Sequence, residues 1–167
     1  VLADGTLLTT TGSSNITVTH LNGDLANTGS GTNTVTLDGD DSSVPSVNDV
    51  TITSSSSITV NNGTLDENDR INLAGIGAKI LTGIKADVNA SGSAGTLSVT
   101  FADLTNAATI TTGTGNVTVT GIDTADTINI DAEELVDNSS TLNIHGAGTH
   151  VVTNLLADTT IDATASG

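Results

Sequence analysis

The sequence predicts an all-β protein, with a parallel β-solenoid as the favoured architecture and an antiparallel β-sandwich as the alternative. Short segments in which apolar and polar residues alternate recur along the 167-residue chain, and this pattern is typical of strands with one apolar face. Clusters of Gly, Asn, Asp and Ser separate these segments and supply the positive-φ positions that tight turns need. Phe101 is the single aromatic residue, so the interior must be thin and filled by Val, Ile, Leu and Ala.

The expected strands follow one another with a turn cluster after most of them. In chain order they are Ile16–Thr19, Thr34–Leu37, Val50–Thr53, Ile58–Val60, Ile71–Leu73, Leu97–Val99, Val117–Val119, Ile128–Ile130 and Leu142–Ile144. The clearest turn clusters are Asn22–Asp24, Asp38–Asp41, Asn61–Gly63, Ser91–Ser93 and Gly113–Asn116. The segment Asp131–Asp137 inserts extra residues, for which we expect one helical turn capped by Asp131.

The spacing of the strands favours the solenoid. Val99 and Val119 lie 20 positions apart, as do Ile110 and Ile130, and this period falls within the known range of repeat architectures. The N-terminal half is less regular: Ile16 to Val35 and Val18 to Leu37 both repeat at 19, and the sequence leaves open whether the array continues there. We therefore expect one all-β domain or repeat array over residues 1–167, with an internal boundary near the apolar segment 71–90 as an alternative.

Charge and motif content exclude several classes of function. The net charge is −16, from 19 acids against Arg70, Lys79 and Lys85, so nucleic acid and anionic membrane surfaces are poor partners. No apolar run is long enough to span a bilayer, and no cysteine is present to form a disulfide or a thiolate site. No nucleophile elbow, phosphate-binding loop or helix-borne metal motif occurs, and we expect no catalytic activity.

The run Thr96–Gly121, followed by Ala125–Ile130, resembles the repeats of bacterial surface-layer proteins and large adhesins, which are rich in Thr, Ala, Gly and Asn. Gly113–Val119 is similar to a degenerate form of the calcium-binding nonapeptide of repeats-in-toxin proteins, although the Asp that would bind calcium is absent. The resemblance implies a secreted protein at the cell surface. It also implies self-association, with a cell-surface polysaccharide as a further candidate partner.

Three acidic clusters are candidate calcium sites, because calcium prefers six to eight oxygen ligands. They are Asp38, Asp40 and Asp41; Asp66, Glu67 and Asp69, with Asn68 between them; and Asp123, Asp126 and Asp131. Calcium would relieve the repulsion between crowded carboxylates. The alternative interpretation is that these residues simply form turns with solvated carboxylates. The histidines His20, His145 and His150 match no zinc spacing.

Together these features predict a non-catalytic, extracellular structural or adhesive protein that self-associates and is stabilised by calcium. One alternative is the subunit of a filament, in which an end strand such as Thr6–Thr9 pairs with the open sheet edge of the next subunit. Another is a sugar- or ice-binding module. The repeated Thr-x-Thr pairs are similar to the flat faces of ice-binding solenoids, but those need rungs of equal length and the spacing here varies, so β-propensity is the simpler explanation.

Overall fold

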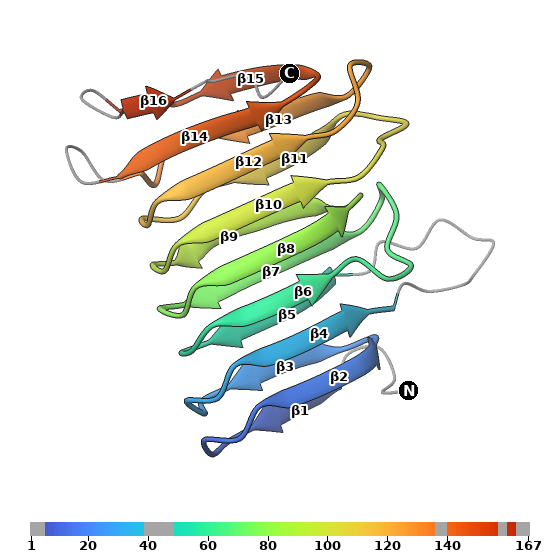
Figure 1. The fold of residues 1–167 in the computed structure, drawn as a ribbon, viewed down its shortest axis with the longest axis vertical. Helices are drawn as coiled ribbons and strands as arrows, with labels where there is room; N and C mark the ends of the chain where they lie inside the picture. The colour runs from blue at the N-terminus through green and yellow to red at the C-terminus, as the bar shows by residue number, and fades with distance from the viewer. Residues whose placement is uncertain (1–5, 39–48, 136–139, 157–159, 163–167) are drawn as a thin grey trace.

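The computed structural model describes residues 6–38, 49–135, 140–156 and 160–162. In these residues the chain winds into a β-solenoid of about seven turns whose strands pair in parallel throughout. Figure 1 shows the strands stacked one above another from the N-terminal to the C-terminal end. The favoured solenoid prediction is therefore confirmed, and the antiparallel sandwich is wrong.

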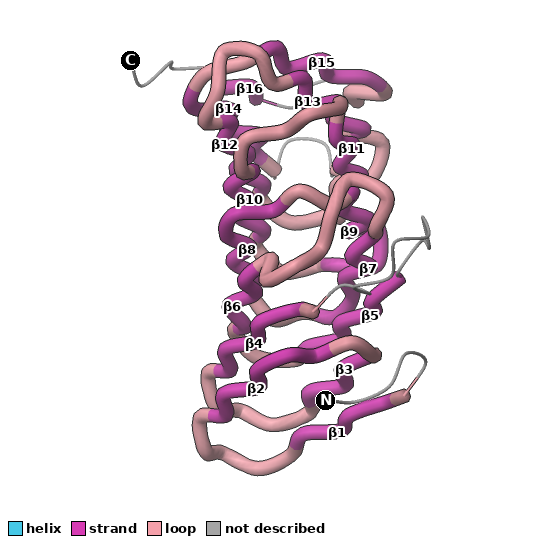
Figure 2. Tube along the Cα trace, turned by 90° about the vertical axis from the view of Figure 1, so that its right-hand side faces the viewer, coloured by secondary structure: helices cyan, strands magenta, loops and turns pink. Residues whose placement is uncertain are grey.

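The strands form two sheets that face each other across the core, seen edge-on in Figure 2. Sheet A contains, in spatial order, β1 (Leu7–Thr10), β3 (Asp24–Asn27), β5 (Asp49–Ser54), β7 (Arg70–Gly75), β9 (Asp87–Ser93), β11 (Ala108–Thr111), β13 (Thr127–Asp131) and β15 (Thr149–Thr153). Sheet B contains β2 (Ile16–Leu21), β4 (Asn33–Leu37), β6 (Ile58–Asn61), β8 (Lys79–Ile84), β10 (Leu97–Phe101), β12 (Val117–Gly121), β14 (Thr141–Gly146) and β16 (Thr160–Asp162). Each odd strand and the even strand after it make one rung.

Alternation along each strand fills the core with aliphatic side chains from both sheets. In β10, for example, Leu97, Val99 and Phe101 are buried while Ser98 and Thr100 face outward. Parallel register then places like side chains in columns, since Val99 pairs with Val119 and Val119 with Ile144. One buried aliphatic cluster therefore extends through the stacked rungs.

The array includes the N-terminal half, which the sequence left undecided. Here Val18 pairs with Val35, a repeat of 17 rather than the expected 19, and the register shifts at His20 before Leu21 pairs with Leu37. His20 has a φ of 56°, an uncommon backbone conformation that accommodates this bulge. The segment 71–90 forms β7, β8 and the start of β9, and these strands pair with neighbours on both sides.

Beyond β13 the expected helical turn is a short hydrogen-bonded turn, as far as the structure describes it. The N–H of Leu135 donates to the carbonyl of Ala132 at 3.2 Å, and Asp131 accepts the N–H of Glu133 at 3.3 Å. Residues 136–139 lie outside the described part of the chain.

The two edges of the solenoid differ. The corners from odd to even strands, which we call the glycine edge, stack so closely that a Cβ on Gly77 would lie 1.9 Å from the carbonyl oxygen of Ser56. A Cβ on Gly95 would lie 2.2 Å from the carbonyl of Gly77, and one on Gly115 would lie 2.3 Å from that of Gly95. The corners from even to odd strands, which we call the loop edge, vary in length and carry many of the acidic residues.

Candidate functional site

Two loop-edge turns, Asp66–Asp69 and Asp123–Asp126, share one hydrogen-bond pattern. The N–H of Asp66 donates to the Asp69 carboxylate at 2.8 Å, and the N–H of Asp69 returns to the Asp66 carbonyl at 3.2 Å. Asp123 and Asp126 make the same pair of contacts at 3.1 and 3.2 Å. In each turn the first Asp also accepts the N–H two residues later, at 2.8 Å. These carboxylates therefore satisfy backbone donors, as Asp commonly does in turns.

Acidic side chains also connect different rungs along this edge. Asp126 is only 1 % exposed, and its second oxygen accepts the N–H of Leu104 at 2.9 Å. The Glu67 carboxylate accepts the N–H groups of Thr105 and Asn106, the latter at 3.0 Å. The rung between them has only Lys85 and Ala86 at this corner, so Glu67 spans a gap that the short corner leaves.

The environment of Glu67 favours its charged form. Partial burial raises the pKa of this carboxyl, but the hydrogen bonds from Thr105 and Asn106 outweigh that effect and hold the pKa below its usual 4.5. The charge is therefore part of the contact between the two loops.

The remaining predicted ligands lie apart from these turns. Asp38 accepts the Thr64 hydroxyl at 2.8 Å and lies 3.4 Å from Nδ1 of His20, whereas Asp40 and Asp41 fall outside the described residues. Asp131 ends β13, whose other end adjoins Asp126, so about 16 Å of strand separates the two. Asp131 instead accepts the side-chain amide of Asn154 at 3.0 Å.

Within the described part of the chain, the structure thus pairs Asp66 with Asp69 and Asp123 with Asp126 but assembles no larger group. Among the residues it describes, no three His, Asp or Glu side chains come together in a way that could hold a metal ion. A cation at either turn would compete with backbone N–H groups for the carboxylate oxygens. Calcium binding by these clusters remains a prediction.

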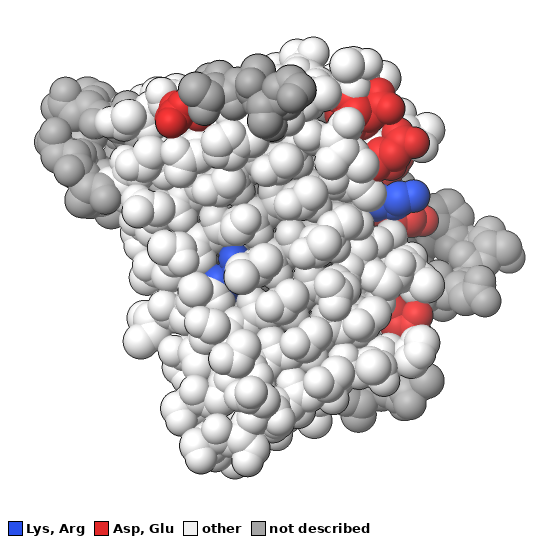
Figure 3. Space-filling view, viewed as in Figure 1, with Lys and Arg blue, Asp and Glu red and all other residues white. Residues whose placement is uncertain are grey.

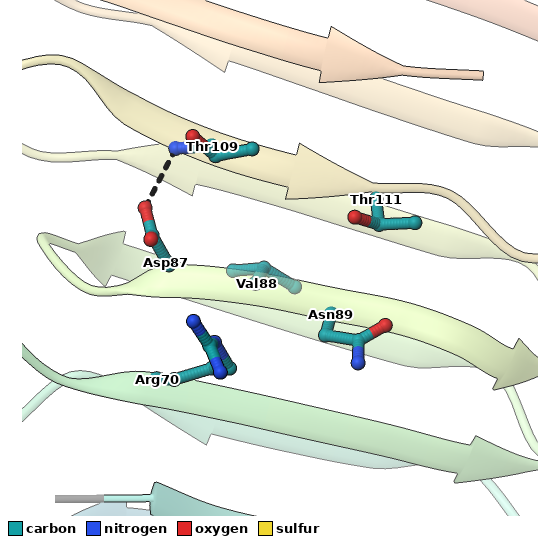
Figure 4. A pocket seen from close by; sticks show the side chains of 6 residues that line it. All are labelled: Arg70, Asp87, Val88, Asn89, Thr109 and Thr111. Atoms are coloured by element: carbon teal, nitrogen blue, oxygen red, sulfur yellow. Dashed lines mark hydrogen bonds between the residues drawn. The ribbon is translucent and has the colours of Figure 1, made fainter. Parts of the chain in front are cut away.

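A polar groove of about 320 Å³ on the outer face of sheet A was not predicted from the sequence. Its lining comes from three neighbouring strands, β7, β9 and β11 (Figure 4): Arg70, Asp87, Val88, Asn89, Thr109 and Thr111. The side chain of Arg70 extends towards Asp87, whose carboxylate accepts the N–H of Thr109 at 2.7 Å. No local sequence signal points to the groove, because it is the register of the folded strands that sets Arg70 beside both Asp49 and Asp87.

Buried polar residues along the glycine edge were also missed. The Asn27 side chain accepts the Thr10 hydroxyl at 3.1 Å and donates to the hydroxyls of Ser54 and Ser56 at 2.9 and 2.8 Å. In β8, Lys79 occupies a core column and is 1 % exposed. Its ammonium donates to the carbonyls of Gly75 and Gly77 at 2.9 and 2.7 Å.

Burial of Lys79 disfavours its charged form. Desolvation lowers the pKa of the ammonium from its usual 10.5. Two carbonyls compensate part of the desolvation, and no carboxylate within 4.0 Å is found among the described residues. Lys79 therefore occupies a position that is aliphatic in the neighbouring strands and donates hydrogen bonds to two backbone carbonyls at the corner.

No protein-family model matches this chain, and no curated protein or solved structure is measurably similar to it. Among the described residues no helix has the length and hydrophobicity needed to cross a bilayer. Function must therefore be inferred from the geometry of the solenoid itself.

Proposed function

We propose that this chain is a non-catalytic structural segment of an extracellular surface protein, similar in role to the repeats of surface-layer proteins and adhesins. The observation that carries the proposal is the uninterrupted stack of parallel rungs around one aliphatic core. Such a stack is a quasi-one-dimensional rod in which each rung contacts only its neighbours. It holds its two ends at a fixed separation, which suits a spacer or lattice element.

The roles of the acidic side chains support this proposal. Asp24 accepts the N–H of Thr51 at 2.7 Å, and Asp87 and Asp126 each accept an N–H from another rung. These residues therefore satisfy the backbone between rungs. The charge of −16 also makes calcium the proposed stabilising ion in an extracellular medium, because a divalent cation would reduce the repulsion along the loop edge.

Calcium dependence is tested on the purified chain by thermal unfolding, followed by circular dichroism, with millimolar calcium or with a chelator. The proposal expects a higher melting temperature with calcium, since binding to the folded state stabilises it. Magnesium at the same concentration is the control for ionic strength. Equal melting temperatures in calcium, magnesium and chelator would remove calcium from the proposal.

The open ends of both sheets favour a second candidate, the filament subunit. Strands β1 and β2 at one end, and β15 and β16 at the other, pair on one side only within the described chain. Exposed apolar side chains lie on these rungs, among them Leu7 at 63 %, Val151 at 41 % and Ile161 at 40 %. Unpaired strand edges with apolar side chains are templates for strand addition by another copy.

Electron microscopy and sedimentation separate the two candidates. A filament subunit forms ordered fibres, and the Leu7→Lys and Val151→Lys variants should abolish them, because a lysine at an edge strand opposes pairing. Both positions are exposed, so the circular dichroism of each variant should match that of the parent chain. A monodisperse monomer with and without calcium would reject the filament and leave the spacer.

A further inference from the structure

The outer face of sheet B carries two straight columns of uncharged side chains, most of them short; the exception is Ile80, which is 49 % exposed. Parallel register aligns two outward positions of every strand from β4 to β12. The first column is Thr34, Thr59, Ile80, Ser98 and Thr118, and the second is Thr36, Asn61, Thr82, Thr100 and Thr120. Thr17 extends the first column at one end, and Asn143 and His145 extend the two columns at the other.

This alignment removes the objection that the sequence raised against a regular face. The first column joins residues 25, 21, 18, 20 and 25 positions apart between Thr34 and Asn143. Corners of different length accommodate these differences, so the outward positions of neighbouring strands stay aligned. Side chains therefore repeat about every 4.8 Å along the rod and about every 6.6 Å across it.

The face is neutral although the chain is strongly acidic. None of the ten column positions from β4 to β12 is charged, whereas sheet A displays Asp24, Arg70 and Asp87 on its outer face. Figure 3 shows the sheet B face, where the acidic atoms lie towards the edges and a small group of basic atoms is visible left of the centre. The ten column positions themselves thus offer a charged partner no complementary group, and they do not repel a neutral one.

Two neutral partners fit the face poorly. Sugar chains are commonly bound by aromatic side chains, but Phe101, the one aromatic residue, is 0 % exposed. A second copy of the chain needs about 800 Å² per partner for a standard stable interface. The two columns, of seven and six positions, cover roughly 400 Å² at the spacings of a β-sheet.

The side chains suit an ordered water lattice. Threonine presents a hydroxyl that both donates and accepts hydrogen bonds, beside a methyl group. Its branched Cβ restricts rotation, so little side-chain entropy is lost when the face is covered. Seven of the ten column positions are Thr, which gives hydroxyls and methyls in a two-dimensional repeat.

We propose that the outer face of sheet B, centred on Thr82 and Thr100, binds the surface of ice crystals. Ice is neutral, flat and periodic in two dimensions, and it presents only hydrogen-bond donors and acceptors. The columns hold a layer of water in register with that surface, and the methyl groups occupy the spaces between. This activity is independent of the proposed spacer role, so the failure of either leaves the other unaffected.

The test is incorporation of the purified chain into slowly growing ice, with thermal hysteresis measured on the same samples. The variants Thr82→Tyr and Thr100→Tyr place a bulky ring within the columns, and Thr53→Tyr places the same ring on the exposed outer face of sheet A. We expect the parent chain and Thr53→Tyr to be enriched in ice several-fold over a non-binding protein. Thr82→Tyr and Thr100→Tyr should fall to the level of that protein.

Circular dichroism and melting temperature establish that all the variants are folded. The proposal is overturned if the parent chain enters ice no more than the non-binding protein, or if the ring at Thr100 has the same effect as the ring at Thr53. It is also overturned if the columns instead bind insoluble cellulose or chitin. The same holds if sedimentation shows that the parent chain is a dimer and that Thr100→Tyr is a monomer.

Discussion

A single methyl group at the glycine edge should destabilise the solenoid severely. In Gly77→Ala the added Cβ would lie 1.9 Å from the Ser56 carbonyl oxygen and 2.5 Å from its carbon. An ordinary van der Waals contact begins at 3.4 Å, so the two corners must separate by about 1.5 Å, against a strand spacing of about 4.8 Å. The methyl is attached to backbone and meets backbone, so no side chain can rotate away.

The cost follows from the contacts that such a separation would break. Gly77 donates to the Ser54 carbonyl at 3.1 Å, and Ile58 donates to the Ala78 carbonyl at 2.9 Å. Losing both hydrogen bonds costs about 2 kcal/mol, and overpacking adds about 1 kcal/mol or more. We therefore expect the free energy of unfolding to fall by about 3 kcal/mol, which is roughly a 150-fold change in the unfolding equilibrium.

Gly83→Ala is the matched control. Gly83 has a φ of +67°, and no atom lies within 4 Å of its added Cβ. Its cost is therefore backbone strain alone, about 1 kcal/mol. Urea unfolding followed by far-UV circular dichroism measures both variants. The reasoning is refuted if Gly77→Ala unfolds within about 0.5 kcal/mol of the parent chain, or if Gly83→Ala is the less stable of the two.

Two further predictions concern charge. Burial lowers the pKa of Lys79 below 10.5, so between the folded pKa and 10.5 the unfolded chain binds more protons than the folded chain. The stability of the parent chain should therefore rise with pH across that range. Urea midpoints should show a smaller rise for Lys79→Met, and an equal rise in both proteins would contradict this account. The folded pKa of Glu67 lies below 4.5, so its stabilisation is present above pH 4.5 and is lost as the pH falls through the folded pKa. Glu67→Gln should therefore be less stable than the parent chain at neutral pH by about 1 kcal/mol, after allowance for solvent exposure. This difference in stability should become smaller in acid. If thermal melts show the same difference at neutral and acidic pH, the charge of Glu67 is excluded as its cause.

The sequence predicted the fold where its period was clear. The separation of Val99 from Val119 and that of Ile110 from Ile130 are the registers found in sheets B and A. In the N-terminal half the same reasoning gave a repeat of 19, whereas Val18 pairs with Val35 at a repeat of 17. A shift of two residues keeps every side chain on the same face of the sheet, so alternation identifies a strand but does not distinguish these two registers.

The sequence also predicted some parts of the candidate sites and missed others. Local clusters such as Asp66 with Asp69 could be predicted, since four-residue turns are encoded in adjacent residues. The inclusion of Asp131 with Asp123 and Asp126 was not supported, because an extended strand carries Asp131 away from the turn. The groove beside Arg70 and Asp87 lies between residues 17 positions apart, and only the register places them together.

By itself, the sequence determined that this chain is built from short strands around a thin aliphatic core, and it favoured parallel pairing while leaving the antiparallel sandwich as an alternative. That information is local, because alternation and turn chemistry act over a few residues. The tertiary structure alone decided which strands are neighbours, and with them the burial of Lys79 and the straight columns on sheet B. The physical reason is that corners of unequal length absorb the irregular spacing, while hydrogen bonding between strands fixes the register of the side chains.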